Sequence, residues 1–165
     1  FNSCKICDNV SSFKEFEFDG YTYCYVASKC KLGIENVHYS GGVRITDKER
    51  TTLDSIKDMD KISGIEEVLA NIDGFTSLNE EKLTGYLQEY HNQFLYQKTG
   101  FILYPYRDKL GLSHSFFEMC QYKTGKSKRY LTKEFTNGTY IKEWKLVVPD
   151  EIYKLKNGAF QDDRI

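Results

Sequence analysis

The stretch GVRITDKERTTLDSI, residues 42–56, decides the fold because the spacing of its apolar residues changes inside it. Its first part follows a Ser-Gly-Gly turn and contains β-branched residues, which is typical of a short strand. Further on, Leu53 and Ile56 are spaced as on one face of a helix. The stretch therefore predicts a strand over residues 42–46 that runs directly into a helix over residues 47–56.

Polar residues of the same stretch are placed to fix this junction. Thr46 or Asp47 is a good N-cap, and Glu49 follows Thr46 at the spacing of a capping box. Arg50 and Asp54 are four residues apart, so they can pair along one face of the helix. A purely structural role for these residues and a binding role both fit the pattern.

The rest of the chain separates into three regions. Aromatic residues alternate around Asp19-Gly20, a strong hairpin signal, and predict strand structure over residues 15–26. Apolar residues at helical spacing predict helices over residues 64–71 and 79–97, the second with Asn79 as N-cap. An alternating run before Pro149 predicts a strand over residues 140–148. The run from Phe101 to Tyr104 fits either a strand or a helix.

The composition fits one globular domain. The chain has 165 residues, of which 40% are hydrophobic and 28% are charged. We therefore expect residues 1–165 to form one α+β domain, with N-terminal strands, a central helical bundle-like region and C-terminal strands packed together. No apolar stretch is long enough to span a bilayer and no signal peptide opens the chain, so we expect a cytoplasmic protein. Because Phe1 is not a start methionine, we expect a further domain upstream.

Few residues are arranged for catalysis or metal binding. Cys4 and Cys7 form a C-x2-C pair, but Cys24 and Cys30 do not complete a zinc site at a workable spacing. The histidines have no partners at metal spacing, and the sequence contains no phosphate-binding glycine motif or nucleophile elbow. We therefore expect no catalytic residues, no metal ligands and no cofactor, and reduced thiols as in a cytoplasmic protein.

The charge balance bears on nucleic-acid binding. The net charge is −1, which disfavours tight DNA binding by this chain alone, because phosphate contacts supply most of such affinity. A local basic cluster follows residue 122 and is a set of candidate nucleic-acid contacts, although a solvated loop is the more ordinary interpretation. Its members are Lys123, Lys126, Lys128, Arg129 and Lys133.

Residues 42–54 resemble the signature of the AbiEi family of antitoxins, which reads approximately G-V-R-V-T-D-x-E-R-T-L-L-D. Thr52 stands where the family often has Leu. Further blocks resemble the family in the same order, and the resemblance extends over about residues 13 to 150. These blocks are FEFDG at residues 16–20, SGIEEVL at 63–69, EKLTGY at 81–86, FIL at 101–103 and WKLVVP at 144–149. The signature residues that we single out, as structural or binding residues, are Arg44, Thr46, Asp47, Glu49, Arg50 and Asp54.

The resemblance implies a function without catalysis. It implies the C-terminal antitoxin domain of a type IV toxin–antitoxin system for phage defence, with an N-terminal winged helix-turn-helix missing from this chain. The implied partners are operator DNA, bound through the missing domain, and a nucleotidyltransferase-like toxin that need not be stably bound. No membrane partner is implied.

Two other functions remain as alternatives. One is a metal-dependent nuclease-like α/β enzyme, for which Asp47, Glu49 and Asp54 are the candidate carboxylates. Such a site also needs an acidic-x-Lys strand, and Glu143-Trp144-Lys145 is the nearest match, although ordinary strand alternation explains it. The other alternative is a ligand-sensing domain of a transcription factor.

Overall fold

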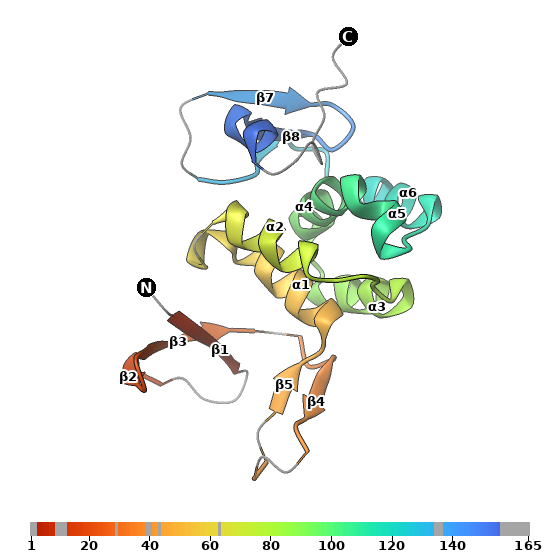
Figure 1. The fold of residues 1–165 in the computed structure, drawn as a ribbon. Helices are drawn as coiled ribbons and strands as arrows, with labels where there is room; N and C mark the ends of the chain where they lie inside the picture. Colours follow the sequence, from red (N-terminus) through yellow and green to blue (C-terminus); the bar gives the residue numbers. More distant parts are fainter. Residues whose placement is uncertain are drawn as a thin grey trace.

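The computed structural model confirms a mixed α+β architecture (Figure 1). A layer of helices lies between an N-terminal group of strands and a C-terminal three-stranded sheet. The structure describes residues 3–8, 13–28, 30–38, 41–42, 44–62, 64–133 and 137–155.

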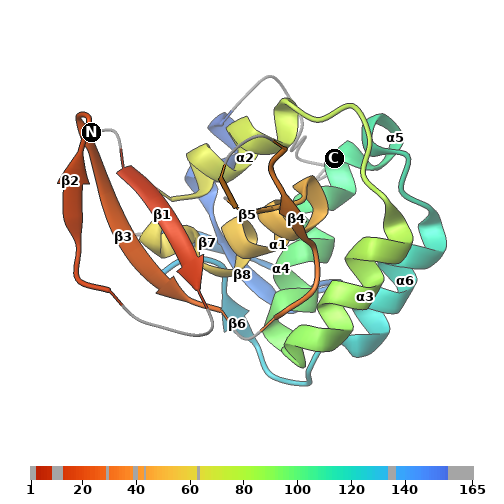
Figure 2. The same cartoon turned by 90° about the horizontal axis from the view of Figure 1, so that it is seen from below.

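The N-terminal sheet has the strand order β1-β3-β2 and lies beside the helices (Figure 2). It consists of β1 (Ser3–Asp8), β2 (Phe16–Phe18) and β3 (Tyr21–Ala27), with β1 parallel and β2 antiparallel to β3. Asp19 and Gly20 both have positive φ, 52° and 76°, as a two-residue hairpin turn requires. The strand structure predicted over residues 15–26 is therefore a hairpin.

A second hairpin leads into the first helix. Strand β4 (Ile34–Asn36) pairs antiparallel with β5 (Arg44–Thr46), and α1 (Lys48–Lys57) begins two residues after β5 ends. The predicted strand–helix junction is thus confirmed. Figure 1 shows this hairpin projecting from the helical layer, on the side opposite the C-terminal sheet.

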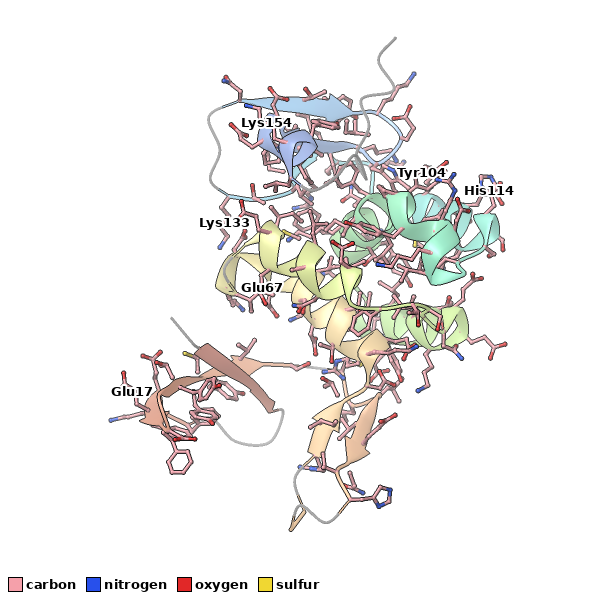
Figure 3. All side chains as sticks on the ribbon, viewed as in Figure 1. Glu17, Glu67, Tyr104, His114, Lys133 and Lys154 are labelled. Atoms are coloured by element: carbon pink, nitrogen blue, oxygen red, sulfur yellow. The ribbon has the colours of Figure 1, made fainter. Side chains whose placement is uncertain are left out.

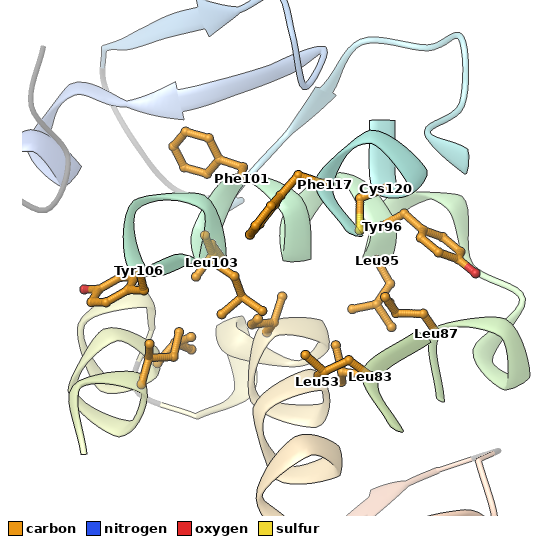
Figure 4. Close-up of a cluster of buried hydrophobic side chains, with 14 of the residues drawn as sticks. Leu53, Leu83, Leu87, Leu95, Tyr96, Phe101, Leu103, Tyr106, Phe117 and Cys120 are labelled. Carbon is orange, nitrogen blue, oxygen red and sulfur yellow. The ribbon is translucent and has the colours of Figure 1, made fainter. Parts of the chain in front are cut away.

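The helical layer is organised around α1. This helix contacts α2 (Ile65–Asp73), α3 (Glu80–Tyr90) and α4 (Gln93–Leu103), and α4 in turn contacts α6 (His114–Lys123). Short helical turns complete the layer: η1 (Met59–Lys61), η2 (Tyr104–Tyr106) and α5 (Arg107–Leu110). Leucines and aromatic side chains from these helices form the core (Figure 4), and Leu53, Leu83 and Ile102 are completely buried there.

The single helix predicted over residues 79–97 is wrong. The helix ends before His91, because a left-handed φ of 48° at this residue cannot continue an α-helix. Asn92 then starts α4, because its side-chain oxygen accepts hydrogen bonds from the backbone N–H groups of Phe94 and Leu95. The undecided run from Phe101 is helical and forms the end of α4.

The C-terminal sheet has the order β6-β8-β7 and consists of β6 (Arg129–Tyr130), β7 (Gly138–Ile141) and β8 (Leu146–Pro149). It is followed by η3 (Asp150–Lys154). The single strand predicted over residues 140–148 is therefore wrong as well: it is a hairpin, whose turn ends at Lys145 with a φ of 51°.

Trp144, in that turn, joins the C-terminal sheet to the helices. It is 5% exposed, and its ring packs against Gly100 in α4. A Cβ at position 100 would lie 2.0 Å from the indole ring. A glycine is therefore required where the helix and this ring meet.

Candidate functional site

Four of the six signature residues form a largely buried polar cluster at the base of the β4–β5 hairpin, which we call the junction clamp. It consists of Asp47, Glu49, Arg50 and Asp54 with the groups that they bind. Asp47 is the N-cap of α1, and its Oδ1 accepts a hydrogen bond of 2.8 Å from the backbone N–H of Arg50. The N-cap is thus Asp47 and not Thr46, whose hydroxyl instead bonds that of Thr51 at 2.7 Å.

Arg50 ties three separate segments together. Its side chain is 2% exposed, and Nε donates to Oδ2 of Asp54 at 2.7 Å. Nη1 donates to the carbonyl of Leu32 at 2.7 Å, and Nη2 donates to the hydroxyl of Ser28 at 2.6 Å. The guanidinium also lies 5.5 Å from the centre of the Tyr90 ring. The predicted pairing with Asp54 is therefore confirmed, and Arg50 also binds the chain that enters β4.

Helix α3 supplies the partners of the acidic residues. Oδ2 of Asp47 accepts hydrogen bonds from the hydroxyl of Tyr86 at 2.6 Å and from Nζ of Lys82 at 3.0 Å. The hydroxyl of Tyr90 donates to Oδ1 of Asp54. These contacts connect the start and the middle of α1 to one face of α3.

Glu49 does not complete a capping box with Thr46. It is 2% exposed, and its Oε1 accepts a hydrogen bond of 2.8 Å from the backbone N–H of Asn79. Asn79 is itself the N-cap of α3, as predicted, because its side chain accepts from the backbone N–H of Lys82. The carboxylate of Glu49 therefore lies at the positive end of a second helix, where a negative charge is stabilised.

The electrostatics of the clamp favour its ionised form. Burial opposes ionisation of Asp47, but the hydrogen bonds from Tyr86, the Arg50 backbone and Lys82 outweigh it and hold the pKa of Asp47 below its usual range. Burial likewise disfavours the charged form of Arg50, but the negative charge of Asp54 outweighs it and raises the pKa of Arg50 above its usual value. Burial and Asp54 raise the pKa of Tyr90, so it acts as a hydrogen-bond donor.

The first part of the signature is exposed. Arg44 is exposed in β5 opposite Asn36, Ile45 is 51% exposed, and Thr46 is half-buried. At the base of the hairpin, the backbone N–H of Asp47 donates to the carbonyl of Gly33 at 2.9 Å. Gly33 has a φ of 69°, and a Cβ there would lie 2.9 Å from both Arg50 and Tyr86. The clamp thus fixes the base of a hairpin whose strands face solvent.

The basic cluster lies elsewhere, between α6 and the C-terminal sheet. All five of its members are exposed: Lys123, Lys126, Lys128, Arg129 and Lys133. Lys133 projects from the C-terminal layer, well separated from the N-terminal sheet that carries Glu17 (Figure 3). The signature residues lie on β5 and α1, so the two groups of predicted site residues belong to different elements of the fold.

The residues of the nuclease alternative are arranged differently from what such an enzyme needs. Each of Asp47, Glu49 and Asp54 accepts hydrogen bonds from groups of this chain. Glu143-Trp144-Lys145 lies in the β7–β8 turn and not in a strand. Within the described residues, no three His, Cys, Asp or Glu side chains are grouped to hold a metal ion. The side chains of Cys4 and Cys7 lie outside the described part.

Sequence reasoning missed the partners of the clamp on α3 and before β4. In the sequence, Tyr86 and Tyr90 fall on the apolar face of the helix predicted over residues 79–97. Their spacing of four residues on a core-facing stripe is the available signal, because a buried tyrosine hydroxyl needs a hydrogen-bond partner. Ser28 and the carbonyl of Leu32 carry no comparable signal, because their position depends on the tertiary fold.

In the part of the chain that the structure describes, no helix has the length and apolar character needed to cross a bilayer. The resemblance to AbiEi antitoxins rests on the quoted motifs. Neither a protein-family model, a curated protein nor a solved structure matches this chain.

Proposed function

We propose that this chain is the non-catalytic C-terminal domain of an AbiEi-type antitoxin, which counters a nucleotidyltransferase-like toxin and supports repression of its own operon. The observation that carries the proposal is the division of the signature into two parts. Asp47, Glu49 and Arg50 are buried and bonded internally, whereas Arg44 and Ile45 are exposed on the hairpin that the buried residues hold.

This division suits recognition better than catalysis. A hairpin fixed at its base presents its side chains in one geometry, which lowers the entropy lost when a partner binds. The β4–β5 hairpin offers a cation at Arg44 and, on the same face, an apolar group at Ile34, which is 39% exposed, whereas Ile45 is exposed on the other face. In contrast, the clamp carboxylates are engaged by Arg50, Tyr86 and the start of α3, so they are unsuited to proton transfer.

Co-expression of the full-length protein with the toxin encoded next to it tests the proposal. We expect growth to be restored, and we expect Arg44→Glu to abolish the rescue while leaving the melting temperature unchanged. Arg107→Glu is the matched control, because the side chain of Arg107 is 40% exposed and lies in α5, away from the hairpin. The control should retain the rescue.

Two outcomes separate the proposal from its alternatives. If the neighbouring gene encodes no nucleotidyltransferase-like protein, and this chain relieves the toxicity of no such protein, the antitoxin proposal fails and the alternative of a ligand-sensing domain is favoured. If a chelator abolishes the rescue, the metal-dependent alternative is favoured, because the clamp needs no metal to hold its carboxylates. Operator binding by the full protein should also exceed that of residues 1–165, whose net charge is −1.

A further inference from the structure

The outer surface of the C-terminal sheet carries a row of three paired residues. Tyr130 in β6 and Tyr140 in β7 both lie opposite Val147 in the central strand β8. Paired residues lie on the same face of a sheet, so the two tyrosines flank the valine on one face. Tyr130 is 56% exposed and Tyr140 is 46% exposed, whereas Val147 is buried between the outer strands.

A lysine stands over both rings. Nζ of Lys128 lies 5.9 Å from the centre of the Tyr130 ring and 5.5 Å from that of Tyr140. Both distances are within the range of cation–π attraction. A cation is therefore held between two exposed aromatic side chains that stand two strand spacings apart, about 10 Å.

The loop that carries this lysine is anchored and does not behave as a free solvated segment. The amide of Gln97, which is 1% exposed, donates to the carbonyl of Ser127, and Lys145 donates to the carbonyl of Gly125 at 3.2 Å. A Cβ on Gly125 would lie 2.7 Å from the Gln93 side chain, so the loop packs directly against the start of α4. The positions of Lys126 and Lys128 are consequently fixed by the fold.

Positive charge is concentrated around this surface. Residues 121–145 contain seven basic and two acidic residues, which gives a local net charge of +5 in a chain whose total is −1. A basic region on an otherwise acidic chain is the electrostatic footprint of a polyanion-binding surface. The exposed aromatics within it add a feature that a simple counter-ion surface lacks.

We propose that this surface binds single-stranded nucleic acid, with bases stacked on Tyr130 and Tyr140 and phosphates contacting Lys128, Lys126 and Lys123. Single strands are bound by such combinations of aromatic platforms and cations. The two tyrosines stand on strands about 10 Å apart, well beyond the rise of about 3.4 Å between stacked bases in a duplex, so each is placed to stack a separate, splayed nucleotide of one strand. Lys128, between the rings, is placed for the phosphate that joins them. This inference does not rest on the antitoxin proposal.

Fluorescence anisotropy of labelled oligouridine and oligodeoxythymidine of about twelve nucleotides tests the inference on the full 165-residue chain. We expect both strands to bind and a duplex of the same length to bind more weakly. Tyr130→Ala and Tyr140→Ala should each weaken binding on the order of tenfold, as loss of one stacked base does. The phenylalanine variants at these positions should retain it, because the stacking ring remains. Tighter binding of one strand type would assign the surface to RNA or to DNA.

Lys128→Gln should weaken binding and reduce the dependence of log affinity on log salt concentration by about 0.7, the contribution of one single-strand phosphate contact. Tyr21→Ala is the matched control, because this tyrosine is 45% exposed on the separate N-terminal sheet. Thermal denaturation verifies that each variant is folded. Equal affinity for duplex, or single-strand binding that survives loss of both tyrosines, would overturn the stacking surface, as would absence of binding at low salt.

Discussion

Replacing Arg50 with alanine is the most direct test of the junction clamp. The substitution removes three hydrogen bonds. It leaves Oδ2 of Asp54 and the carbonyl of Leu32 without the Arg50 donor, and the Asp54 carboxylate keeps the hydroxyl of Tyr90 at Oδ1 but loses its opposite charge. Loss of one partner from a buried, hydrogen-bonded ion pair costs about 3–5 kcal/mol. That is a large part of the roughly 5–15 kcal/mol by which a domain is stable.

The expected result is a large fall in stability. For a domain of this size each kcal/mol corresponds to roughly 2–4 °C, so the melting temperature should fall by roughly 6–20 °C. Urea denaturation monitored by circular dichroism measures the change in the free energy of unfolding directly. Arg50→Lys should give an intermediate loss, because an ammonium keeps the charge but cannot make the three forked contacts. On the antitoxin proposal, neutralisation of the toxin should be lost together with stability.

A double-mutant cycle with Asp54→Ala separates the ion pair from the other contacts of Arg50. We expect a coupling energy of about 0.5–3 kcal/mol, because the two side chains are in direct contact. If Arg50→Ala lowers the free energy of unfolding by less than about 1 kcal/mol, a loss typical of exposed ion pairs, Arg50 does not hold the junction clamp together. If stability is kept and neutralisation alone is lost, Arg50 is a contact residue and not a structural one.

Three further changes test other parts of the fold. Gly100→Ala should lower the melting temperature by several degrees, because its Cβ would overlap the Trp144 ring and overpacking costs about 1–3 kcal/mol; an unchanged melting curve would contradict this contact. The lowered pKa of Asp47 means that its carboxylate adds to the free energy of unfolding above about pH 4, and that this stabilisation is lost as the pH falls through the folded-state pKa. Asp47→Asn should therefore be less stable than the wild type at pH 7 and lose less stability on acidification, and parallel pH profiles of the two proteins would contradict this. Burial lowers the pKa of Lys98, so its charge destabilises the fold fully below that lowered pKa, and the penalty shrinks as the pH rises from there toward the ordinary lysine pKa of about 10.4. Lys98→Met should therefore be more stable than the wild type at pH 7, with the difference shrinking at high pH, and a less stable variant would contradict this.

The junction was predictable from the sequence because its signals are local. The change of period, the cap at Asp47 and the pairing of Arg50 with Asp54 depend on residues within one or two helical turns. The Asp19-Gly20 hairpin was predictable for the same reason, since two positive φ angles in a row favour this dipeptide.

The two wrong elements share a physical cause. Both His91 and Lys145 adopt a left-handed backbone although neither is glycine or asparagine. Residue type gives little warning of such a conformation, because tertiary contacts impose it against local preference. Near Lys145 these contacts include the burial of Trp144. Because no glycine marks either position, the sequence pattern predicts one continuous helix in place of α3 and α4 and one continuous strand in place of β7 and β8.

The candidate site was only half predictable. Its acidic and basic members on α1 could be named, but the donor Tyr86 lies 39 positions from Asp47 and the acceptor Ser28 lies 22 positions from Arg50. The surface around Tyr130 and Tyr140 on the C-terminal sheet could not be predicted for a similar reason. The basic residues were visible as a cluster, but Tyr130 and Tyr140 meet only through their common pairing with Val147.

The clamp and the exposed hairpin are best understood as one mechanical unit. An isolated two-stranded hairpin is marginally stable in water, so the geometry of β4 and β5 must come from what holds their ends. Those ends are fixed where Asp47 bonds the carbonyl of Gly33 and where Arg50 bonds that of Leu32. Loss of Arg50 should therefore disorder the hairpin without touching any of its exposed side chains. Hydrogen exchange should show lost protection at Asp47, whose N–H binds the carbonyl of Gly33, and at the paired residues Glu35 and Ile45 in Arg50→Ala. Protection at these amides should be unchanged in Arg44→Glu, and equal protection in both variants would show that the hairpin does not depend on the clamp.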